Sequence, residues 1–431
     1  MRNITVWSVC SLLLVLVAGC PRPRPNDPMT GPEKVAVAKP ATFAFSLCSS
    51  GLPEDGMWKC DPVFADVDGD GFVDLAALAR LGQGPRLWKS DGTGSWQEFS
   101  TGMTPGMPSC GGGLDFADVN GDGRLDLVVA DHCQGIFVYL SDGAGDWKMV
   151  VESMCPLDLP AGSAEAIMHQ GAEDLSVGDV NGDGMADIVA SSSDEGGINV
   201  YLGDGTGTGW HKATTGLPDT GWANRVLLVD LNSDDVPDLL ASYADGPRVW
   251  LNGGDGSWLP GSTGLPTPVL RGLYTGIAAG DINEDGLVDI SLANWIDGPE
   301  VYLQQADGSW RKTADVFPEM LGGAVGLALG DLDGNGHLDM VVSGRLTRDG
   351  GYVRGVFALR GDGTGQWDYD AGSGLPETGL SATTGIALAD LNGDGLLEVA
   401  AGSGLIVETV PGSKAPIIPT RLLVWCAQPL E

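Results

Sequence analysis

DVDGDGFVD, residues 66–74, is the first of seven acidic nonapeptides that recur along this 431-residue chain. The others are DVNGDGRLD at 118, DVNGDGMAD at 179, DLNSDDVPD at 230, DINEDGLVD at 281, DLDGNGHLD at 331 and DLNGDGLLE at 390. Their start-to-start steps are 52, 61, 51, 51, 50 and 59 residues. A unit that returns this regularly indicates a repeat architecture, and it also carries the residues of a candidate metal site.

The spacing of oxygen ligands within the nonapeptide favours calcium. Oxygen-bearing side chains occupy the first, third, fifth and ninth positions, with Gly usual at the sixth. Hard cations take such a set of oxygen ligands, at distances of about 2.3–2.6 Å. An EF-hand opens in the same way, but it ends in a bidentate Glu at position twelve and lies between helices. The twelfth residues here are all apolar, in runs such as DLVVAD at 126, so we expect the loop to join two strands.

The rest of each unit predicts four short strands, named A to D. Strand A precedes the motif, B follows it, C is a run such as FVYL at 137, and D begins at a Trp after a turn such as SDGAGDW at 141. Asp-Gly between alternating strands is a hairpin signal. Four strands in a unit of this length match the period of propeller blades. The predicted fold is all-β: a seven-bladed β-propeller with four antiparallel strands per blade.

The seventh unit ends at Glu431 without a strand D, and we predict that the start of the folded region supplies it. The segment TFAFSLCSSGLP, 42–53, aligns with SWLPGSTGLP of the fourth unit, which places Phe45 where Trp258 stands. This strand is expected to complete the last blade, leaving no open sheet edge between the ends. The tryptophans that begin strand D are expected to pack blade against blade: Trp96, Trp147, Trp210, Trp258, Trp310 and Trp367.

The motif D-x-[DN]-x-[DN]-G-x-x-[DE] between strands A and B resembles the FG-GAP/VCBS repeat, also found in the propeller of integrin α subunits, over residues 41–431. The resemblance implies one calcium ion per loop, bound by the first, third, fifth and ninth side chains and the seventh carbonyl. Six full sites are expected: Asp66, Asp68, Asp70 and Asp74; Asp118, Asn120, Asp122 and Asp126; Asp179, Asn181, Asp183 and Asp187; Asp281, Asn283, Asp285 and Asp289; Asp331, Asp333, Asn335 and Asp339; Asp390, Asn392, Asp394 and Glu398.

The fourth unit departs from this pattern. Asp235 replaces the sixth-position Gly, which eases a sharp turn, and Pro237 stiffens the segment. Its ligand positions are still polar: Asp230, Asn232, Asp234 and Asp238. We therefore expect the weakest or an empty site there, and six or seven Ca²⁺ ions in all.

Residues 1–20, MRNITVWSVCSLLLVLVAGC, have the pattern of a secretion signal and are too short for a comfortable membrane span. The closing Val-Ala-Gly-Cys resembles a bacterial lipobox, which implies cleavage before Cys20 and its acylation. The alternative is an ordinary signal peptide with a free Cys20. The Pro-rich stretch 21–40 predicts an extended tether to the propeller of 41–431. We therefore expect an exported protein, lipid-anchored at the outer membrane or cell surface of a bacterial envelope.

Six cysteines follow the signal: Cys48, Cys60, Cys110, Cys133, Cys155 and Cys426. An even number in an exported chain suggests three disulfides. Cys110 and Cys133 lie at the open end of the hairpin around the second motif, so we predict a bridge between them. Cys48 is expected to pair with Cys426 across the closing blade or with nearby Cys60, and the sequence does not choose between the two.

The net charge and the lack of known catalytic motifs argue against several classes of function. A net charge of −35 with 23 Lys and Arg argues against nucleic-acid binding. No serine elbow, P-loop, zinc motif or dinucleotide fingerprint occurs. No catalytic residue or organic cofactor is therefore predicted. An enzyme that cleaves polysaccharide or phosphodiester bonds is the alternative, and it would need a Lys, Arg, Tyr or His cluster in the central mouth.

The main hypothesis is a non-catalytic, monomeric binding or scaffolding propeller. Its calcium loops lie on one face, and its B–C and D–A loops present the other face to an envelope or extracellular protein or glycan. A purely structural envelope component is a third possibility. Aromatic and Arg side chains dominate binding hot spots. The candidate contact residues are Trp58, Trp222, Tyr274, Trp295, Arg271, Arg345, Arg348 and Arg354.

Overall fold

The computed structural model describes residues 43–58, 60–80, 84–103, 109–154, 171–192, 196–313, 321–348, 351–378, 380, 383–403 and 421–429. The predicted signal and tether lie outside these residues. Every element in the described segments is a β-strand. None of these segments forms a helix with the length and apolar character needed to cross a bilayer.

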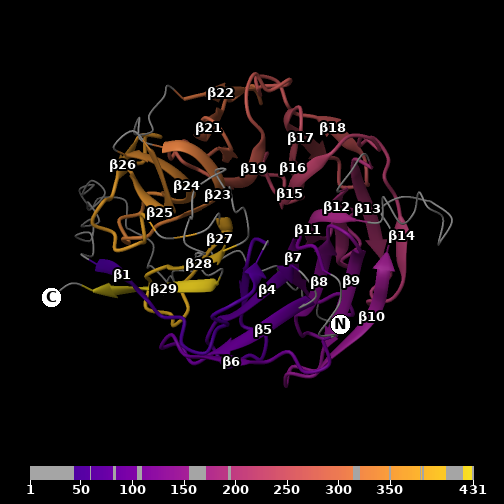
Figure 1. Cartoon of the computed structure of the whole chain (residues 1–431). Helices are drawn as coiled ribbons and strands as arrows, with labels where there is room; N and C mark the ends of the chain where they lie inside the picture. The colour runs from indigo at the N-terminus through magenta and orange to yellow at the C-terminus, as the bar shows by residue number, and fades with distance from the viewer. Residues whose placement is uncertain are drawn as a thin grey trace, which may run out of the picture.

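The strands form seven antiparallel sheets around a common centre, as predicted (Figure 1). Blade 1 contains β2 (Met57–Trp58), β3 (Val63–Ala65), β4 (Asp74–Arg80), β5 (Gly84–Ser90) and β6 (Trp96–Glu98). Blade 2 contains β7 (Leu114–Ala117), β8 (Asp126–Asp131), β9 (Gly135–Ser141) and β10 (Trp147–Met154). Blade 3 contains β11 (Ala172–Gly178), β12 (Asp187–Ser192), β13 (Ile198–Gly203) and β14 (Trp210–Lys212). Blade 4 contains β15 (Ala223–Val229), β16 (Asp238–Tyr243), β17 (Gly246–Asn252) and β18 (Trp258–Pro260). Blade 5 contains β19 (Tyr274–Gly280), β20 (Asp289–Asn294), β21 (Gly298–Gln304) and β22 (Trp310–Lys312). Blade 6 contains β23 (Leu321–Gly330), β24 (Asp339–Arg348), β25 (Gly351–Gly361) and β26 (Trp367–Tyr369). Blade 7 contains β27 (Thr383–Ala389), β28 (Glu398–Ser403), β29 (Leu422–Pro429) and β1 (Phe43–Leu47).

Each nonapeptide forms the turn between strands A and B. In blade 3, Gly178 pairs with Asp187, and in blade 5 Gly280 pairs with Asp289. The residue before the motif therefore faces its ninth residue, and the first eight residues make the turn. The B strands that follow, such as β8 and β12, are buried along their whole length because neighbouring blades cover both of their faces. This burial explains why the residues after the first Asp are mostly apolar or small.

The N-terminal strand closes the ring. β1 pairs with β29, from Phe43 opposite Pro429 to Leu47 opposite Trp425. Phe45 is buried, and its N–H donates to a carbonyl of blade 6, as the N–H groups of Trp96 and Trp147 donate to the blades before them. The prediction that the N-terminal strand completes the last blade is confirmed. The predicted equivalence of Phe45 with the strand-D tryptophans is confirmed as well.

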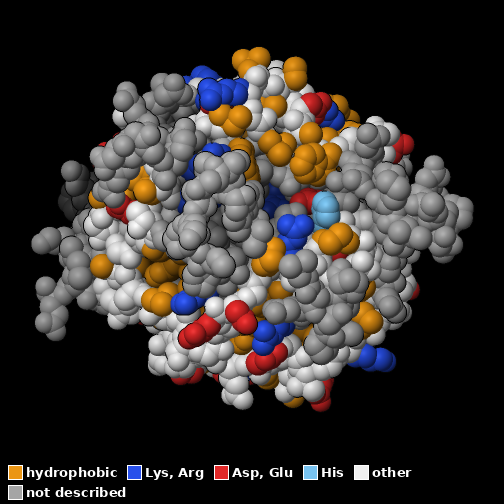
Figure 2. Space-filling model, in the orientation of Figure 1, with side chains coloured by type: hydrophobic (Ala, Val, Ile, Leu, Met, Phe, Trp, Pro, Cys, Tyr) orange, Lys and Arg blue, Asp and Glu red, His pale blue; other side chains and the backbone are white. Residues whose placement is uncertain are grey.

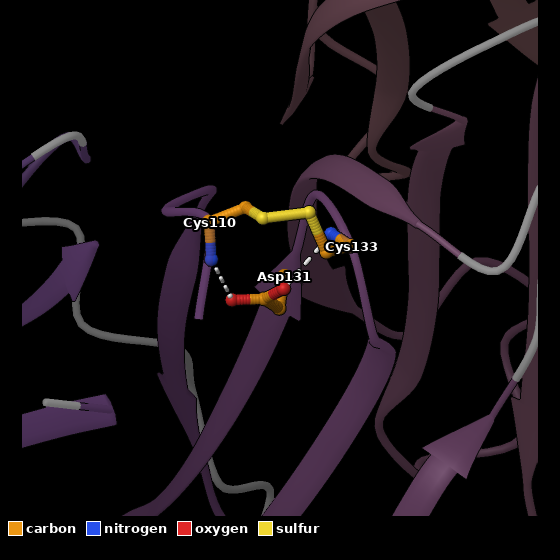
Figure 3. A group of neighbouring side chains, drawn as sticks. All are labelled: Cys110, Asp131 and Cys133. Atoms are coloured by element: carbon orange, nitrogen blue, oxygen red, sulfur yellow. Dashed lines mark hydrogen bonds between the residues drawn. A yellow bond between two sulfur atoms is a disulfide. The ribbon is translucent and has the colours of Figure 1, made fainter. Parts of the chain in front are cut away.

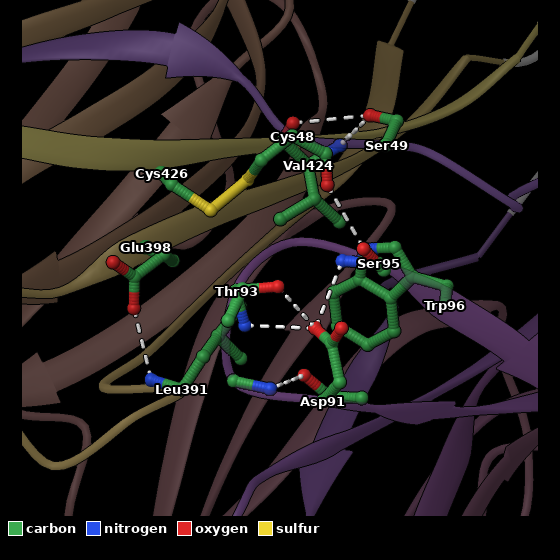
Figure 4. The surroundings of a disulfide bond; sticks show 12 residues. Cys48, Ser49, Asp91, Thr93, Ser95, Trp96, Leu391, Glu398, Val424 and Cys426 are labelled. Atoms are coloured by element: carbon green, nitrogen blue, oxygen red, sulfur yellow. Dashed lines mark hydrogen bonds between the residues drawn. A yellow bond between two sulfur atoms is a disulfide. The ribbon is translucent and has the colours of Figure 1, made fainter.

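A disulfide fastens the closing seam. Cys48, one residue beyond β1, is bonded to Cys426 of β29 (Figure 4). This bond settles the alternative left open by the sequence: Cys48 pairs with Cys426 and not with Cys60, which is buried. The described residues contain two of the three expected disulfides, and Cys155 lies outside these residues, so the third stays a prediction.

The second disulfide is the predicted one between Cys110 and Cys133. The carboxylate of Asp131 accepts the backbone N–H groups of Cys110 and Cys133 at 3.0 and 2.9 Å (Figure 3). Burial raises the pKa of this carboxyl group. Its oxygens are thus used to hold the two ends of the bridge in place.

The segment SGRLTRDGGYVRG, residues 343–355, belongs mostly to strands. β24 and β25 extend past the ends of the other B and C strands, and the last pair is Arg348 with Gly351. Blade 6 therefore carries a long hairpin on the face away from the nonapeptides.

Candidate functional site

The carboxylates of each nonapeptide are oriented by backbone N–H groups of the same turn. In the first loop, Asp66 accepts the N–H groups of Gly69, Asp70 and Gly71 at 2.8–3.1 Å. Asp70 in turn accepts the N–H of Phe72 at 3.0 Å. The same bonds recur in the second loop around Asp118. These bonds fix the ligand oxygens without a side chain from outside the turn.

The ninth residue ties the turn to strand C. Asp74 is fully buried; its Oδ2 accepts the N–H of Val67 and its Oδ1 accepts the N–H of Ser90, at 3.1 and 2.9 Å. Burial, helped by the nearby charges of Asp68 and Asp70, raises its pKa to about 7. The pKa is raised, chiefly by burial, in all six equivalent residues: Asp126, Asp187, Asp238, Asp289, Asp339 and Glu398. A cation in the loop would offset the cost of these buried charges.

The donor set fits calcium. Ligand oxygens of Asp66, Asp68 and Asp74 lie within 4.8 Å of one another, and those of Asp331, Asp333 and Asp339 do the same. These two loops have Asp at the third position, whereas the other five have Asn. All the side-chain donors are carboxylate or amide oxygens, as a hard cation requires.

The two loops with a third-position Asp share a second feature, a basic side chain from strand C. Lys89 contacts Asp68 and lies 2.7 Å from Asp70. Arg360 lies 3.9 Å from Asp333 and 3.1 Å from Asp339. The chain thus places one of its own cations against the extra carboxylate in each of these loops.

The fourth loop keeps the same backbone despite its substitutions. Ser233 and Asp235 both adopt positive φ, at 63° and 66°, and the Asp235 N–H still donates to Asp230 at 2.9 Å. The missing glycine therefore appears as backbone strain rather than as a lost hydrogen bond. The prediction of a weaker site in this loop stays a prediction.

A ring of equivalent residues surrounds the axis on the opposite face. They stand five places before each motif, near the start of strand A, and are Asp61, Gly113, Asp174, Arg225, Gly276, Gly326 and Gly385. Arg225 of blade 4 reaches Asp61 of blade 1, with Nε 2.9 Å from Oδ2. Only residues at the axis can meet across non-adjacent blades. Added Cβ atoms at Gly113 and Gly385 would overlap Asp174 and Asp61, so these glycines make room for the charges.

The three charged residues of this ring, Asp61, Asp174 and Arg225, form what we call the axial triad. Arg225 and Asp174 are only 6% and 7% exposed. Burial raises the pKa of Asp174 to about 7 against the opposing effect of Arg225. Burial would lower the pKa of Arg225, but Asp61 and Asp174 outweigh it, and the pKa is raised.

A histidine–carboxylate pair lies beside the triad. Nδ1 of His132 is hydrogen-bonded to the carboxylate of Glu173, the residue before Asp174. The His132 side chain is 34% exposed and that of Glu173 only 4%. Figure 2 shows basic, acidic and histidine side chains meeting near the centre of one face of the disc. This cluster was not predicted from the sequence. The Asp or Arg that replaces Gly five residues before three of the motifs could have indicated it.

The predicted contact residues divide into two groups. Trp58 and Tyr274 are 0% and 1% exposed, so the prediction that they contact a partner is wrong: both pack inside the blades. Arg271 is 68% exposed, next to Leu270 at 97%. Partly buried positions are Trp222, Trp295, Arg345 and Arg354, and the side chain of Arg348 lies outside the described part of the chain.

Two of these residues are stacked. The guanidinium of Arg345 lies over the ring of Trp295, 5.4 Å from its centroid, and donates to the Trp295 carbonyl at 3.0 Å. Arg271, in the loop before β19, lies 3.4 Å from Asp297 in the turn between β20 and β21. Leu270, Arg271, Trp295, Ile296 and Arg345 are named here the blade 5 patch.

The sequence comparison agrees with the geometry. The FG-GAP-like repeat matches residues 66–129, 118–190, 179–241, 237–292 and 281–342. The chain belongs to the FG-GAP-like repeat family. No curated protein matches it. The match covers the middle of the propeller and adds no information on what an FG-GAP-like chain of this kind binds.

Solved structures resemble this FG-GAP-like propeller at low identity. BBS1N, in complex with ARL6DN and soaked with lead, is 10% identical with a TM-score of 0.53, covering 90% of this chain and 97% of that one. The same complex soaked with mercury gives the same values. An Agrocybe aegerita lectin, described for recognition of non-reducing terminal N-acetylglucosamine, is 16% identical with a TM-score of 0.44, covering 74% of this chain and 84% of that one. At these identities the likeness to BBS1N shows the fold alone.

Proposed function

We propose that this chain is a calcium-stabilised, lipid-anchored propeller of the bacterial envelope. It binds a protein or glycan partner through the face opposite the nonapeptides. The family and the fold support a non-catalytic binding propeller. In this proposal calcium is held by six or seven of the loops and supplies positive charge to their buried carboxylates.

The axial triad is the observation that carries the proposed binding face. Buried charges cost folding free energy unless they are well paired. Four blades place Gly at the same position, so the fold does not need charges there. Charged groups whose pKa values are shifted by burial and by a charged partner are candidates for functional sites. The blade 5 patch adds an exposed Leu and a stacked Arg–Trp pair, which suit a binding hot spot.

A saturation experiment on isolated envelopes tests this proposal. Labelled wild-type protein is compared with a Leu270→Asp/Arg271→Glu variant and with Arg311→Glu, a control on exposed strand D of blade 5. We expect saturable binding by wild type and control, and at least about tenfold weaker binding by the double variant, a loss of about 1.4 kcal/mol. Protease or periodate treatment of the envelopes separates protein from glycan. Equal binding by all three proteins would contradict the proposal.

The anchor is tested separately. Acylation of Cys20 predicts incorporation of labelled palmitate that Cys20→Ser abolishes, together with loss of the protein from the membrane fraction. A chain that keeps its membrane association after this substitution would argue for an ordinary signal peptide.

The His132–Glu173 pair supports a second candidate, an enzyme that cleaves polysaccharide or phosphodiester bonds. A buried carboxylate that orients a half-exposed imidazole is an arrangement suited to general acid–base catalysis. His132→Gln is the direct test, because it removes the imidazole and keeps a polar side chain. Depolymerisation of envelope polysaccharide by wild type, lost in His132→Gln, would favour this candidate over pure binding.

A further inference from the structure

A half-open cavity of about 280 Å³ lies between blades 3 and 4, on the side of the nonapeptide turns. Its floor is formed by Val180, Val200 and Leu202, and Ala213 lines its wall. Trp258 and Asp255, from the turn before β18, complete it. This place is separate from the proposed partner face and plays no part in that proposal.

The small side chain of Ala213 leaves part of this cavity open. The N–H of Ala213 donates to Val200 O just as the N–H of Phe99 donates to Leu87 O, so the two residues are equivalent. In blade 1, the Phe99 ring fills the space above Gly145, where an added Cβ would meet it at 2.6 Å. The corresponding Gly256 has no atom within 4 Å of such a Cβ.

The indole of Trp258 has no acceptor among the residues that the structure describes. Three of the equivalent tryptophans donate from Nε1 to the preceding blade: Trp96 to Cys48 O at 2.9 Å, Trp147 to Phe99 O at 2.9 Å, and Trp310 to Gly261 O at 2.8 Å. Trp210 donates to Gly207 O of its own turn at 3.2 Å, and Trp367, like Trp258, has no acceptor among the described residues. Trp258 has no such bond, although it is 95% buried and lines the same cavity as Ala213, whose carbonyl is the equivalent acceptor. Buried donors are almost always satisfied, so a bound molecule is the natural acceptor here.

We propose that this cavity binds a single neutral pyranose unit. The apolar floor suits one face of a sugar ring, and the indole N–H donates to a ring or hydroxyl oxygen. Sugar hydroxyls donate to the exposed carboxylate of Asp255 and meet Ser257 beside it. Asp255 and the net charge of −35 disfavour an anionic sugar. A volume at the small end of ligand pockets admits one ring and excludes a larger ligand.

Saturation-transfer NMR and calorimetry on the intact folded protein test the proposal. The probes are the methyl glycosides of glucose, galactose and N-acetylglucosamine, with methyl glucuronide as the anionic control. We expect saturable binding of at least one neutral glycoside, with a Kd of ~1 mM. Glucuronide is expected to bind at least about tenfold more weakly, as like charges in a shared site repel.

Three variants locate the site. Ala213→Phe introduces the side chain that the chain already uses at position 99, and it should abolish binding without lowering the melting temperature. Trp258→Phe removes only the donor and should weaken binding at least about fivefold, and it decides the matter if Ala213→Phe fails to fold. Thr313→Phe, at the equivalent position between blades 5 and 6, is the control and should leave binding unchanged. Absence of saturable binding by all three glycosides, or binding unaffected by both cavity variants, overturns the proposal and leaves water as the occupant.

Discussion

Removal of the seam disulfide should destabilise the protein more than removal of the hairpin disulfide. Cys48 and Cys426 are separated by 378 residues, whereas Cys110 and Cys133 are separated by 23. In the chain-entropy model, the longer loop is worth about 6 kcal/mol at 25 °C and the shorter one about 3.4 kcal/mol. Strain and residual unfolded structure reduce both values, but the difference of about 2.5 kcal/mol depends only on the ratio of loop lengths.

The assay is urea unfolding of two double variants, Cys48→Ser/Cys426→Ser and Cys110→Ser/Cys133→Ser. Both carry Cys155→Ser, so that this thiol cannot exchange with the remaining bridge. Unfolding free energies are compared by linear extrapolation, with equal slopes as a check that both variants expose the same surface. We expect the seam variant to lose about 2.5 kcal/mol more than the hairpin variant. An equal or smaller loss for the seam variant would refute the reasoning from loop entropy.

Three further outcomes are expected. Asp235→Gly should raise the free energy of unfolding by about 0.5–1 kcal/mol, because glycine adopts the φ of 66° without strain, and a thermal melt that stays the same or falls contradicts this. Chelation of calcium should lower the melting temperature, because an ion that binds only the folded ring stabilises it by mass action; calorimetry with and without chelator measures this, and an unchanged transition counts against structural calcium. Burial raises the pKa of Asp115 to about 6, above its unfolded value of 3.8. Between pH 3.8 and about 6 the folded protein therefore binds more protons than the unfolded chain, and it loses stability as the pH rises through this range. Asp115→Asn keeps an acceptor for the Val177 N–H and should remove that loss, gaining about 1–3 kcal/mol in urea unfolding at pH 8, whereas an unaltered pH profile would show that Asp115 is ionised at little cost.

The repeat itself was enough to predict the blades, because one motif fixes both the turn and the strands on either side. The seam followed from the missing strand in the seventh unit and the alignment of Phe45 with Trp258. The bridge from Cys110 to Cys133 followed from their positions at one end of a hairpin. All of these are relations within one blade or between strands of known order.

Contacts between distant blades could not be predicted in this way. Asp61 and Arg225 stand 164 positions apart by their numbers and meet only because seven blades close around one axis. The burial of Trp58 also depends on the neighbouring blade, against which an aromatic residue in a short strand is packed. The cavity at Ala213 was missed for a related reason. Its shape depends on how much of the space between two neighbouring blades the side chain at this position fills.

The seam also determines how the ring responds to mechanical load. A pull applied at Phe43 can peel the five residues of β1 away from β29, one pair after another. Peeling then stops at Cys48, because the covalent bond to Cys426 passes the load to the middle of the last blade. Ser49 strengthens the same point, since it exchanges hydrogen bonds with the backbone of Val424. Tension on the preceding segment would therefore be carried by the ring as a whole, and not by the weakest strand in it.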